Sequence, residues 1–456
     1  MSSIRALISP TRIPEAPKVL GPGLTKPGLC NAIIIACGWF LTRGKHAVTQ
    51  ALVETGVSGR VHHERFHRFF SRGAWSPDDL GKLVFAKIVE LLVDPDQPLE
   101  LILDDTLSKH RGPKIFGLDA HLDAVRSTKT VRMFAFGHVW VVLAISVELP
   151  FSQRHWALPI AFRLYQTVKG CEKRGVPYKK KTELGRDMVD MVARWAPDIR
   201  FRVLADSAYA NATLIKGRPS NVTFIGSMRT DSVLTAVPTK FVREPGRPGR
   251  PRLRGERLPK PFELAEDDTH RWKKTRVFIY GKPTLVHFKE VVAQWYRVSG
   301  IEPLRVVIVR TDAGKIPYRV FFSTDPKMST SRILEAYSRR WAIEVCFRDL
   351  KQEFGFEDCQ ARKQNAVERT CPFLGYCYSL LVLWFASLTE SERRAAEVER
   401  PWYRTKQNYS FADVLRAARL VLSQPGVSDL LCDLADLGEI PKRGRRSSSR
   451  LRGPSG

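Results

Sequence analysis

Residues 337–351 of the chain are Tyr-Ser-Arg-Arg-Trp-Ala-Ile-Glu-Val-Cys-Phe-Arg-Asp-Leu-Lys, and this stretch predicts a helix. At about 100° per residue, Tyr337, Arg340, Glu344 and Lys351 fall at about 0°, 300°, 340° and 320°, within one narrow stripe. Apolar residues fall on the same side, namely Ile333, Trp341 and Phe347. Charged groups on an apolar face must be paired or must bind something. Two interpretations are open: an amphipathic helix held by i,i+4 ion pairs such as Arg340 with Glu344, or a binding site.

The spacing Tyr-x2-Arg-x3-Glu-x6-Lys resembles the signature around the third catalytic carboxylate of DDE transposases from bacterial insertion sequences. That resemblance implies a ribonuclease H-like catalytic core in which Glu344 is a metal-binding acid. It also implies that Arg340 and Lys351 bind backbone phosphates of the transposon end, and that Tyr337 contacts the same strand. Arg348, in the same stretch, is a further expected DNA contact.

Two earlier segments supply the other carboxylates that this family requires. Leu101–Thr106 is a short apolar strand that ends in Asp104 and Asp105, and Phe201–Tyr209 is a second one that ends in Asp206. Ala-Asp-x-x-Tyr, as it stands at Asp206, resembles the second motif of the family. The first motif is often Asp-x-Thr, which selects Asp104, whereas a related Asp-Thr form selects Asp105. We favour Asp104, although an Asx turn that merely closes the strand is the alternative role for these two acids.

Three carboxylates suit the chemistry that the resemblance implies. Phosphodiester cleavage and strand transfer are in-line displacements, for which two Mg²⁺ ions roughly 3.5–4 Å apart activate the nucleophile and stabilise the leaving oxygen. Mg²⁺ prefers hard oxygen ligands, so we expect Asp104, Asp206 and Glu344 to hold it, with Mn²⁺ as a substitute. The sequence has no CxxC, HExxH, Walker A or GxGxxG pattern, which argues against a zinc site or nucleotide hydrolysis.

The charge of the chain points to a polyanionic partner. The 456 residues include 74 Lys and Arg against 47 Asp and Glu, a formal net charge of +27. Nucleic acid fits this balance. The expected DNA contacts outside the helix lie in basic clusters: Lys109, Arg111, Lys180, Arg247, Arg250 and Arg252. Arg247, Arg250 and Arg252 belong to a Gly-Arg-Pro loop that would either enter a narrow minor groove or touch phosphates nonspecifically.

Composition also bears on location. Eight scattered cysteines favour a reducing compartment, and the N-terminus has no signal-peptide pattern, so we expect a cytoplasmic, nucleoid-associated protein. The uncharged run Cys371–Leu388 is long enough to span a membrane. Because Pro372, Gly375 and two serines interrupt it and it follows the Glu344 helix closely, we expect a buried core helix instead.

The predicted fold class is α/β, a ribonuclease H-like mixed sheet flanked by helices, with an inserted β-rich subdomain and helical N- and C-terminal regions. The long gap between Asp206 and Glu344 is the reason to expect the insertion. The expected divisions are a loose arm (1–28), a helical DNA-binding region (29–95), the first part of the core (96–215), the insertion (216–300), the second part of the core (301–390), a helical region (391–440) and a basic disordered tail (441–456). Within the helical DNA-binding region, residues 59–72 form either a recognition helix or an amphipathic helix with core phenylalanines.

The sequence therefore predicts a DNA transposase, an endonuclease and strand transferase that acts on transposon terminal inverted repeats and target DNA. We expect a homodimer in a synaptic complex. Two alternatives from other classes are a ribonuclease H-like nuclease of another pathway and a transposase-derived DNA-binding protein without transposition activity.

Overall fold

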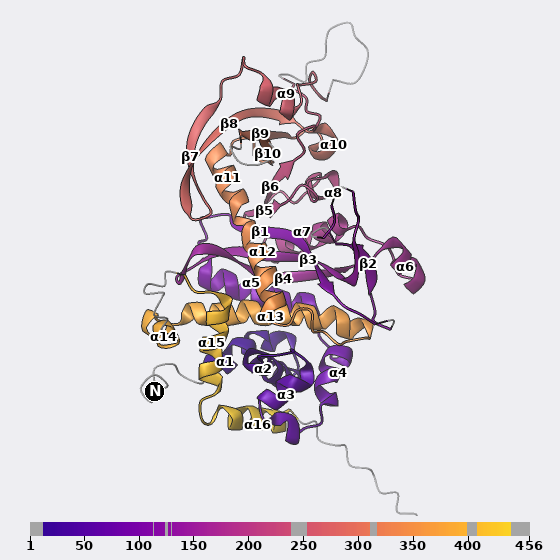
Figure 1. Cartoon of the computed structure of the whole chain (residues 1–456), viewed down its shortest axis with the longest axis vertical. Coiled ribbons are helices and arrows are strands. Elements are labelled where there is room, and N and C mark those ends of the chain that lie inside the picture. Colours follow the sequence, from indigo (N-terminus) through magenta and orange to yellow (C-terminus); the bar gives the residue numbers. More distant parts are fainter. Residues whose placement is uncertain are drawn as a thin grey trace, which may run out of the picture.

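The structure is a computed structural model that describes residues 12–112, 114–123, 126–128, 130–238, 253–310, 317–398 and 408–438. Along the long axis in Figure 1, helices from both ends of the sequence occupy one end, and strands occupy the middle and the other end. The expected minor-groove residues Arg247, Arg250 and Arg252 lie outside the described residues, as does the basic tail.

The N-terminal part is helical. Its elements are α1 (Arg12–Glu15), η1 (Ala16–Gly23), α2 (Lys26–Leu41), α3 (Val48–Glu54), η2 (Val57–Gly59), α4 (Glu64–Arg72) and α5 (Pro77–Leu92). The side chain of Thr25 caps α2, which is buried along most of its length. In α4 the side chains of Phe66, Phe69 and Phe70 are buried, while its histidine and most of its arginine side chains face outward.

The first half of the sheet contains the two strands that the sequence analysis predicted before Asp104 and Asp206. Its strands and helices are β1 (Leu99–Lys109), β2 (Asp119–Leu122), β3 (Phe134–Leu149), β4 (Ser152–Tyr165), α6 (Val168–Arg174), α7 (Lys181–Trp195), β5 (Phe201–Ala205), α8 (Ala212–Ile215) and β6 (Val222–Met228). β4, β3 and β1 are antiparallel neighbours, whereas β1, β5 and β6 run parallel. Strands buried on both faces are continuous apolar runs, as Leu101–Leu103 and Val139–Ile145 are. The expected mixed sheet flanked by helices is confirmed.

The remaining strands continue the same sheet. They are β7 (Lys273–Ile279), β8 (Lys282–Gln294), β9 (Pro303–Arg310) and β10 (Tyr318–Ser323). α9 (Pro261–Glu266) precedes β7, and α10 (Tyr296–Ser299) lies between β8 and β9. β10 pairs antiparallel with β6, so the described residues form one sheet of ten strands that ends at β7. The expected boundary of the insertion at residue 216 thus falls between β5 and β6, two paired strands. The division of the chain into domains remains a prediction.

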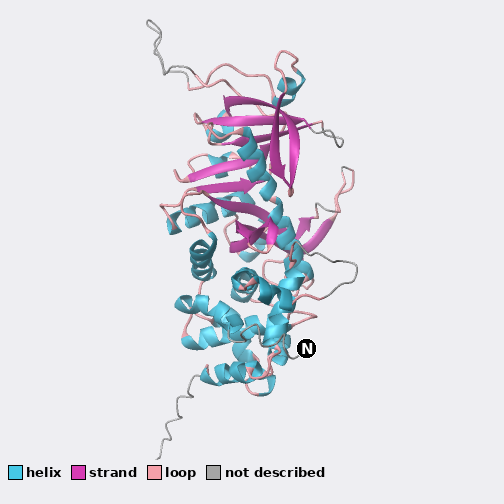
Figure 2. Ribbon diagram, turned by 90° about the vertical axis from the view of Figure 1, so that its left-hand side faces the viewer, coloured by secondary structure: helices cyan, strands magenta, loops and turns pink. Residues whose placement is uncertain are grey.

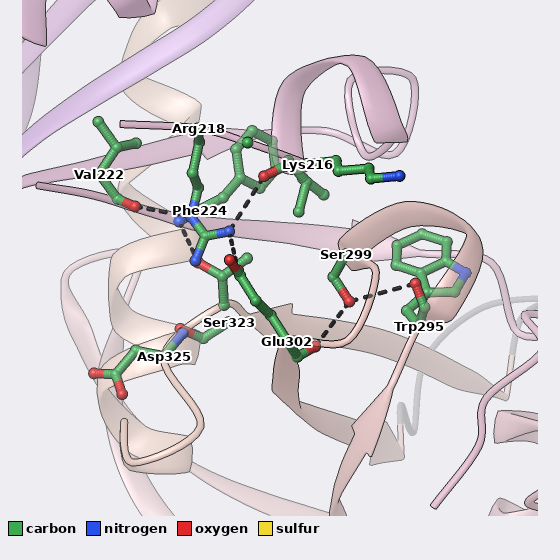
Figure 3. A network of polar contacts seen from close by, with 12 residues as sticks. Lys216, Arg218, Val222, Phe224, Trp295, Ser299, Glu302, Ser323 and Asp325 are labelled. Atoms are coloured by element: carbon green, nitrogen blue, oxygen red, sulfur yellow. Dashed lines mark hydrogen bonds and ion pairs between the residues drawn. The ribbon is translucent and has the colours of Figure 1, made fainter. Parts of the chain in front are cut away.

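A polar network joins the loop before β6 to the turn before β9 (Figure 3). The guanidinium of Arg218 donates to Glu302 at 2.7 Å and to the carbonyl of Val222 at 2.9 Å. Ser299 donates to the carbonyls of Trp295 and Glu302. These contacts hold the loop before β6, the neighbour of β5 in the sheet, against the turn before β9.

The C-terminal part is helical again, with α11 (Thr330–Arg339), α12 (Trp341–Gln352), α13 (Gln364–Ser387), α14 (Glu390–Ala395), α15 (Phe411–Leu422) and α16 (Val427–Leu437). The expectation of one continuous helix over residues 337–351 is wrong, because α11 ends and α12 begins on either side of Arg340. The amide of Ile343 bonds to the carbonyl of Arg340, a three-residue spacing that tightens the turn there. Trp341, which was placed on the apolar face, is 56% exposed as a result.

Among the described residues, α13 is the one helix long and apolar enough to cross a membrane, but 89% of its apolar window is buried inside the protein. It lies between the sheet and the helices α2, α3 and α4, with α5 on its sheet side (Figures 1 and 2). Gly375 brings it against the ring of Phe162 in β4, and the hydroxyl of Ser379 donates to the carbonyl of Pro159. This arrangement agrees with the expected core helix behind the catalytic sheet.

Candidate active site

Asp104 and Asp206 lie side by side at one edge of the sheet. β1 and β5 are parallel neighbours, with Leu103 opposite Ala205. Asp104 follows Leu103 within β1, and Asp206 directly follows Ala205, the last residue of β5. The carboxyl ends of adjacent parallel strands meet at the same edge of a sheet. Asp206 also accepts the amide hydrogen of Ala208 at 2.9 Å, which fixes the loop that follows β5.

Arg340 connects the first carboxylate to the third. Its Nη1 donates to Oδ2 of Asp104 at 2.7 Å and lies 3.6 Å from Oε1 of Glu344. The side chains of Arg340 and Asp104 are 15% and 13% exposed, whereas that of Glu344 is 44% exposed. The turn between α11 and α12 is what aims Arg340 at the strand edge, so the break in the predicted helix belongs to the architecture of the site.

The electrostatics place Asp104, Asp206 and Glu344 in one neighbourhood. Burial raises the pKa of Asp104 to about 7, against the lowering effect of Arg340. The negative charges of Asp206 and Glu344 raise that pKa further. The same three carboxylates raise the pKa of Arg340, although its burial acts the other way. A buried carboxyl group close to two others, with a perturbed pKa, is the pattern that catalytic sites produce.

Asp105 points to the other side of β1, because successive side chains of a strand alternate. Its Oδ2 accepts from Nζ of Lys181 at 2.6 Å, and its Oδ1 accepts from the hydroxyl of Tyr209 at 2.8 Å. Glu183 caps the start of α7 through the amide of Lys180, which sets the direction of Lys181. Asp105 therefore holds α7 and the loop after β5 against the sheet, and the geometry favours Asp104 as the catalytic member of the pair.

The donor set fits a divalent cation in its chemistry. All three acids offer hard oxygen atoms, and one of them is a buried carboxylate, which is costly to keep ionised without a cation nearby. No group of three acidic, His or Cys side chains within the described residues is close enough to hold an ion as it stands. In this arrangement the guanidinium of Arg340 takes the position of a cation between Asp104 and Glu344.

The expected DNA contacts fall at different distances from this centre. Tyr337 lies on the sheet side, where its hydroxyl donates to Oγ of Ser227 at 3.2 Å, and its ring lies under the Arg340 guanidinium. Lys351 is half-buried, and its charge interacts with those of Glu357, Lys109 and Glu344.

The other cations are not gathered at the carboxylates. Arg348 pairs with its neighbour Asp349, and Lys109 pairs with Asp123 at 2.9 Å. Arg111 and Lys180 are exposed near the ends of β1 and α7.

Two supporting residues were not among the sequence candidates. Lys181 and Tyr209 both bind Asp105. Lys181 directly follows the expected DNA contact Lys180, and Tyr209 is the tyrosine of the Ala-Asp-x-x-Tyr motif. The signal that points to Tyr209 is its spacing of three residues from Asp206, which returns its side chain to the sheet after one turn. Lys181 carries no such local signal, because its partner is 76 residues away in the sequence.

A family model described as DDE superfamily endonuclease matches residues 30–284, a range that includes Asp104, Asp105 and Asp206 and ends before Glu344. Among solved structures, the piggyBac transposase synaptic complex with hairpin DNA has 13% sequence identity and a TM-score of 0.37, and the alignment covers 92% of this chain and 79% of that chain. A TM-score this low establishes no shared function. No curated protein matches the chain.

Proposed function

Because the chain belongs to the DDE superfamily endonucleases, we propose that it is a DNA transposase in which Asp104, Asp206 and Glu344 are the catalytic carboxylates. The family match confirms the prediction of a DDE-type enzyme. The observation that carries the site assignment is the single guanidinium of Arg340, which binds Asp104 and faces Glu344 while its charge also interacts with Asp206.

Enzymes of this superfamily generally use divalent metal ions, and we propose Mg²⁺, with Mn²⁺ as a substitute, held by these three residues. Such ions supply the charge that makes a water molecule or a 3′-hydroxyl nucleophilic and stabilises the leaving oxygen of an in-line displacement. For its part, the chain buries Asp104 and excludes water from it, while Glu344 remains accessible from solvent. A half-exposed acid next to a buried one leaves one open side from which a DNA strand can approach.

Arg340 has two roles in this proposal. In the protein without DNA, it neutralises Asp104 and Glu344 and keeps the buried carboxylate in place. When the carboxylates bind cations, the guanidinium is free to turn toward a phosphate beside the scissile bond, where its planar fork suits two phosphate oxygens. Lys351, about three turns further along α12, would bind another phosphate of the same DNA. Tyr337 would pack against the strand that Arg340 binds.

The substrates that follow are double-stranded transposon ends with terminal inverted repeats, and target DNA. The proposed reaction is a nick at the transposon end, after which the freed 3′-hydroxyl attacks the target through the same carboxylates. Two ends must be joined to one target, so we propose a homodimer in a synaptic complex that works on the nucleoid in the cytoplasm.

The test is Mg²⁺-dependent cleavage of a plasmid that carries the inverted repeats flanking the gene. Glu344→Gln keeps the size of the side chain and removes its charge, so cleavage should fall by orders of magnitude while binding to the ends persists. Glu353→Gln, at an exposed position at the end of the same helix, is the matched control and should cleave normally. Equal cleavage by the Glu344→Gln variant and its control would overturn the site assignment.

A further inference from the structure

The β2–β3 hairpin carries an apolar face that nothing in the described part of the chain covers. Ala120 pairs with Phe136 and Leu122 pairs with Phe134, so the four side chains share one side of a two-stranded ribbon. Phe134 and Phe136 are 65% and 63% exposed, and Leu122 is 49% exposed. On the other side of the ribbon, His121 is buried. Two adjacent aromatic rings left this open on a strand mark a contact surface and not a core.

This apolar face belongs to the same side of the sheet as Asp104. Val142 of β3 lies opposite Asp104, and His138 lies opposite Ser108. Because side chains alternate, every second residue of β3 from Val142 back to Phe134 projects on that side. Ser108 donates to the carbonyl of Phe356, just beyond α12, which identifies this side as the one that α12 covers.

Along β3, the part of this side that α12 covers ends before Phe136 and Phe134. Trp140 and His138 are buried, and Phe136 and Phe134 are the first residues of the series to reach solvent. Phe136 is six residues from Val142, a span of about 20 Å at about 3.4 Å per residue. Figure 1 shows β2 at the edge of the sheet beside β3, opposite in the sheet order to β7. The apolar face therefore begins where the cover by α12 ends, about 20 Å in a straight line from the position opposite Asp104.

The charges around the hairpin identify the kind of partner. Exposed cations lie in the segments that lead into β2 and join it to β3: Arg111, Lys114, Arg126 and Arg132. The two acids of the hairpin are already bound within the chain, Asp119 to Arg174 and Asp123 to Lys109. A second copy of a chain with a net charge of +27 would bring like charges together here, whereas a polyanion would be attracted.

We propose that Phe134 and Phe136 form a stacking site for the bases of the bound DNA, on the nucleotides about six base pairs from the scissile phosphate. This site rests on the proposed function, because it requires DNA in the active site. At about 3.4 Å per base pair, the distance of about 20 Å from the position opposite Asp104 corresponds to about six base pairs. Aromatic side chains bind bases through their faces and accept any base, and apolar side chains can enter a duplex between two base pairs and unstack them. The hairpin would thus hold the flank of the cleavage site while the surrounding cations bind phosphates.

The experiment uses the full chain and a duplex of 30 base pairs that ends on the inverted repeat flanking the gene. The fluorescent base 2-aminopurine is placed at each position from three to nine in turn, since its emission changes when its stacking on neighbouring bases changes. We expect the change on protein binding to be largest near position six. Phe134→Ala combined with Phe136→Ala should abolish it and weaken binding about five- to a hundredfold, with an unchanged slope of log affinity against log salt, because no phosphate contact is lost.

Three further variants make the result specific. Phe134→Tyr with Phe136→Tyr keeps both rings and should restore the fluorescence change. Phe278→Ala removes a comparable ring, 58% exposed on β7, and should bind and respond as the unchanged protein does. Thermal melts should be the same for all variants, because the rings that are removed are exposed.

An unchanged fluorescence response in the double alanine variant would overturn the inference. A change in the oligomeric state of that variant without DNA, together with an unchanged response to DNA, would also overturn it, because the face would then bind a second copy of the chain. Failure here is separable from failure of the proposed function. Loss of cleavage in Glu344→Gln together with a normal DNA response in the double alanine variant would uphold the active site and exclude the stacking site. A chain that binds no duplex from the flanks of its gene would overturn both.

Discussion

Replacement of Asp104 by Asn should stabilise the protein at neutral and alkaline pH while it abolishes cleavage. Burial raises the pKa of this carboxyl group from 3.8 to about 7, despite the ion pair with Arg340. One pKa unit corresponds to about 1.36 kcal/mol, so about three units correspond to about 4 kcal/mol. Keeping Asp104 ionised destabilises the folded protein by this free energy. Asparagine has nearly the same size and no charge, so it does not carry this cost.

The sign of the pH dependence of stability follows from the number of protons bound by the folded and the unfolded state. With a folded pKa of about 7 and an unfolded pKa of 3.8, the folded state binds more protons between these values, so its stability falls as the pH rises through that range. The gain from Asp104→Asn should therefore grow from about 1.5 kcal/mol at pH 5 to about 4 kcal/mol at pH 8. Glu344 remains near Arg340 after the substitution and keeps its guanidinium partly paired.

The assay is urea unfolding at pH 5 and pH 8 in buffer with a chelator, followed by circular dichroism. Addition of Mg²⁺ should then stabilise the unchanged protein and have little effect on the variant, because a ligand that binds only the folded state raises its stability. Asp105→Asn is the control. It loses the charge that binds Lys181 and alters the acceptor of the Tyr209 hydroxyl, so it should lose about 1–3 kcal/mol at both pH values.

An Asp104→Asn variant that is less stable than the unchanged protein at pH 8 would refute this reasoning. So would a gain of the same size at pH 5 and pH 8, because the effect would then have no connection with ionisation. If Asp105→Asn proved the more damaging substitution for cleavage, the metal-binding role would pass to Asp105.

Three other predictions concern the phosphate contacts, the metal and the helical part. Arg340→Ala and Lys351→Ala should each lower cleavage and flatten the slope of log affinity against log salt by about 0.9 per lost phosphate contact, whereas a role limited to ion pairs within the helix would leave that slope unchanged. Removal of divalent ions with EDTA should stop cleavage but not end binding in a gel-shift assay, and Mg²⁺ or Mn²⁺ should restore it; cleavage that continues in excess EDTA would contradict the carboxylate site. Gly38→Ala should cost about 1–3 kcal/mol in urea unfolding, because the added Cβ would come within 2.4 Å of the carbonyl oxygen of Ala51, an atom that cannot rotate away, whereas Gly44→Ala, which meets nothing within 4 Å, should be nearly neutral.

Local sequence patterns were sufficient for the strands that deliver the carboxylates. Leu101–Leu103 and Phe201–Leu204 are apolar runs followed by acids, and both are buried strands of the predicted kind. The family match confirms the enzyme class that the signature in residues 337–351 implied. The sequence favoured Asp104 over Asp105 only through the resemblance, and the catalytic role of either acid remains a prediction. Which of the two faces Arg340 depends on packing against α12, and in the structure it is Asp104.

Other features depend on contacts between distant residues. An angle of about 100° per residue holds only while a helix is continuous, so the turn at Arg340 moved Trp341 out to solvent against expectation. The pairing of β6 with β10 joins residues almost a hundred positions apart, and nothing in either strand alone indicates its neighbour. The face formed by Phe134 and Phe136 also escaped notice, because exposed and buried aromatic residues look alike in a sequence.

The order of strands in the sheet also has a consequence for the newly made protein. Asp104 is synthesised 240 residues before Glu344, and the neighbour of its strand, β5, appears midway between them. At about 5–20 residues per second, translation from the first acid to the last takes on the order of 10–50 seconds. Throughout that interval the growing chain has strand β1 but neither Arg340 nor the third acid. The helical end is completed later still, because Arg419 of α15 donates to the carbonyl of Phe40 in α2. If Glu344 is the third catalytic acid, as we propose, a chain released before α12 is made lacks that acid, and only finished molecules can cut DNA.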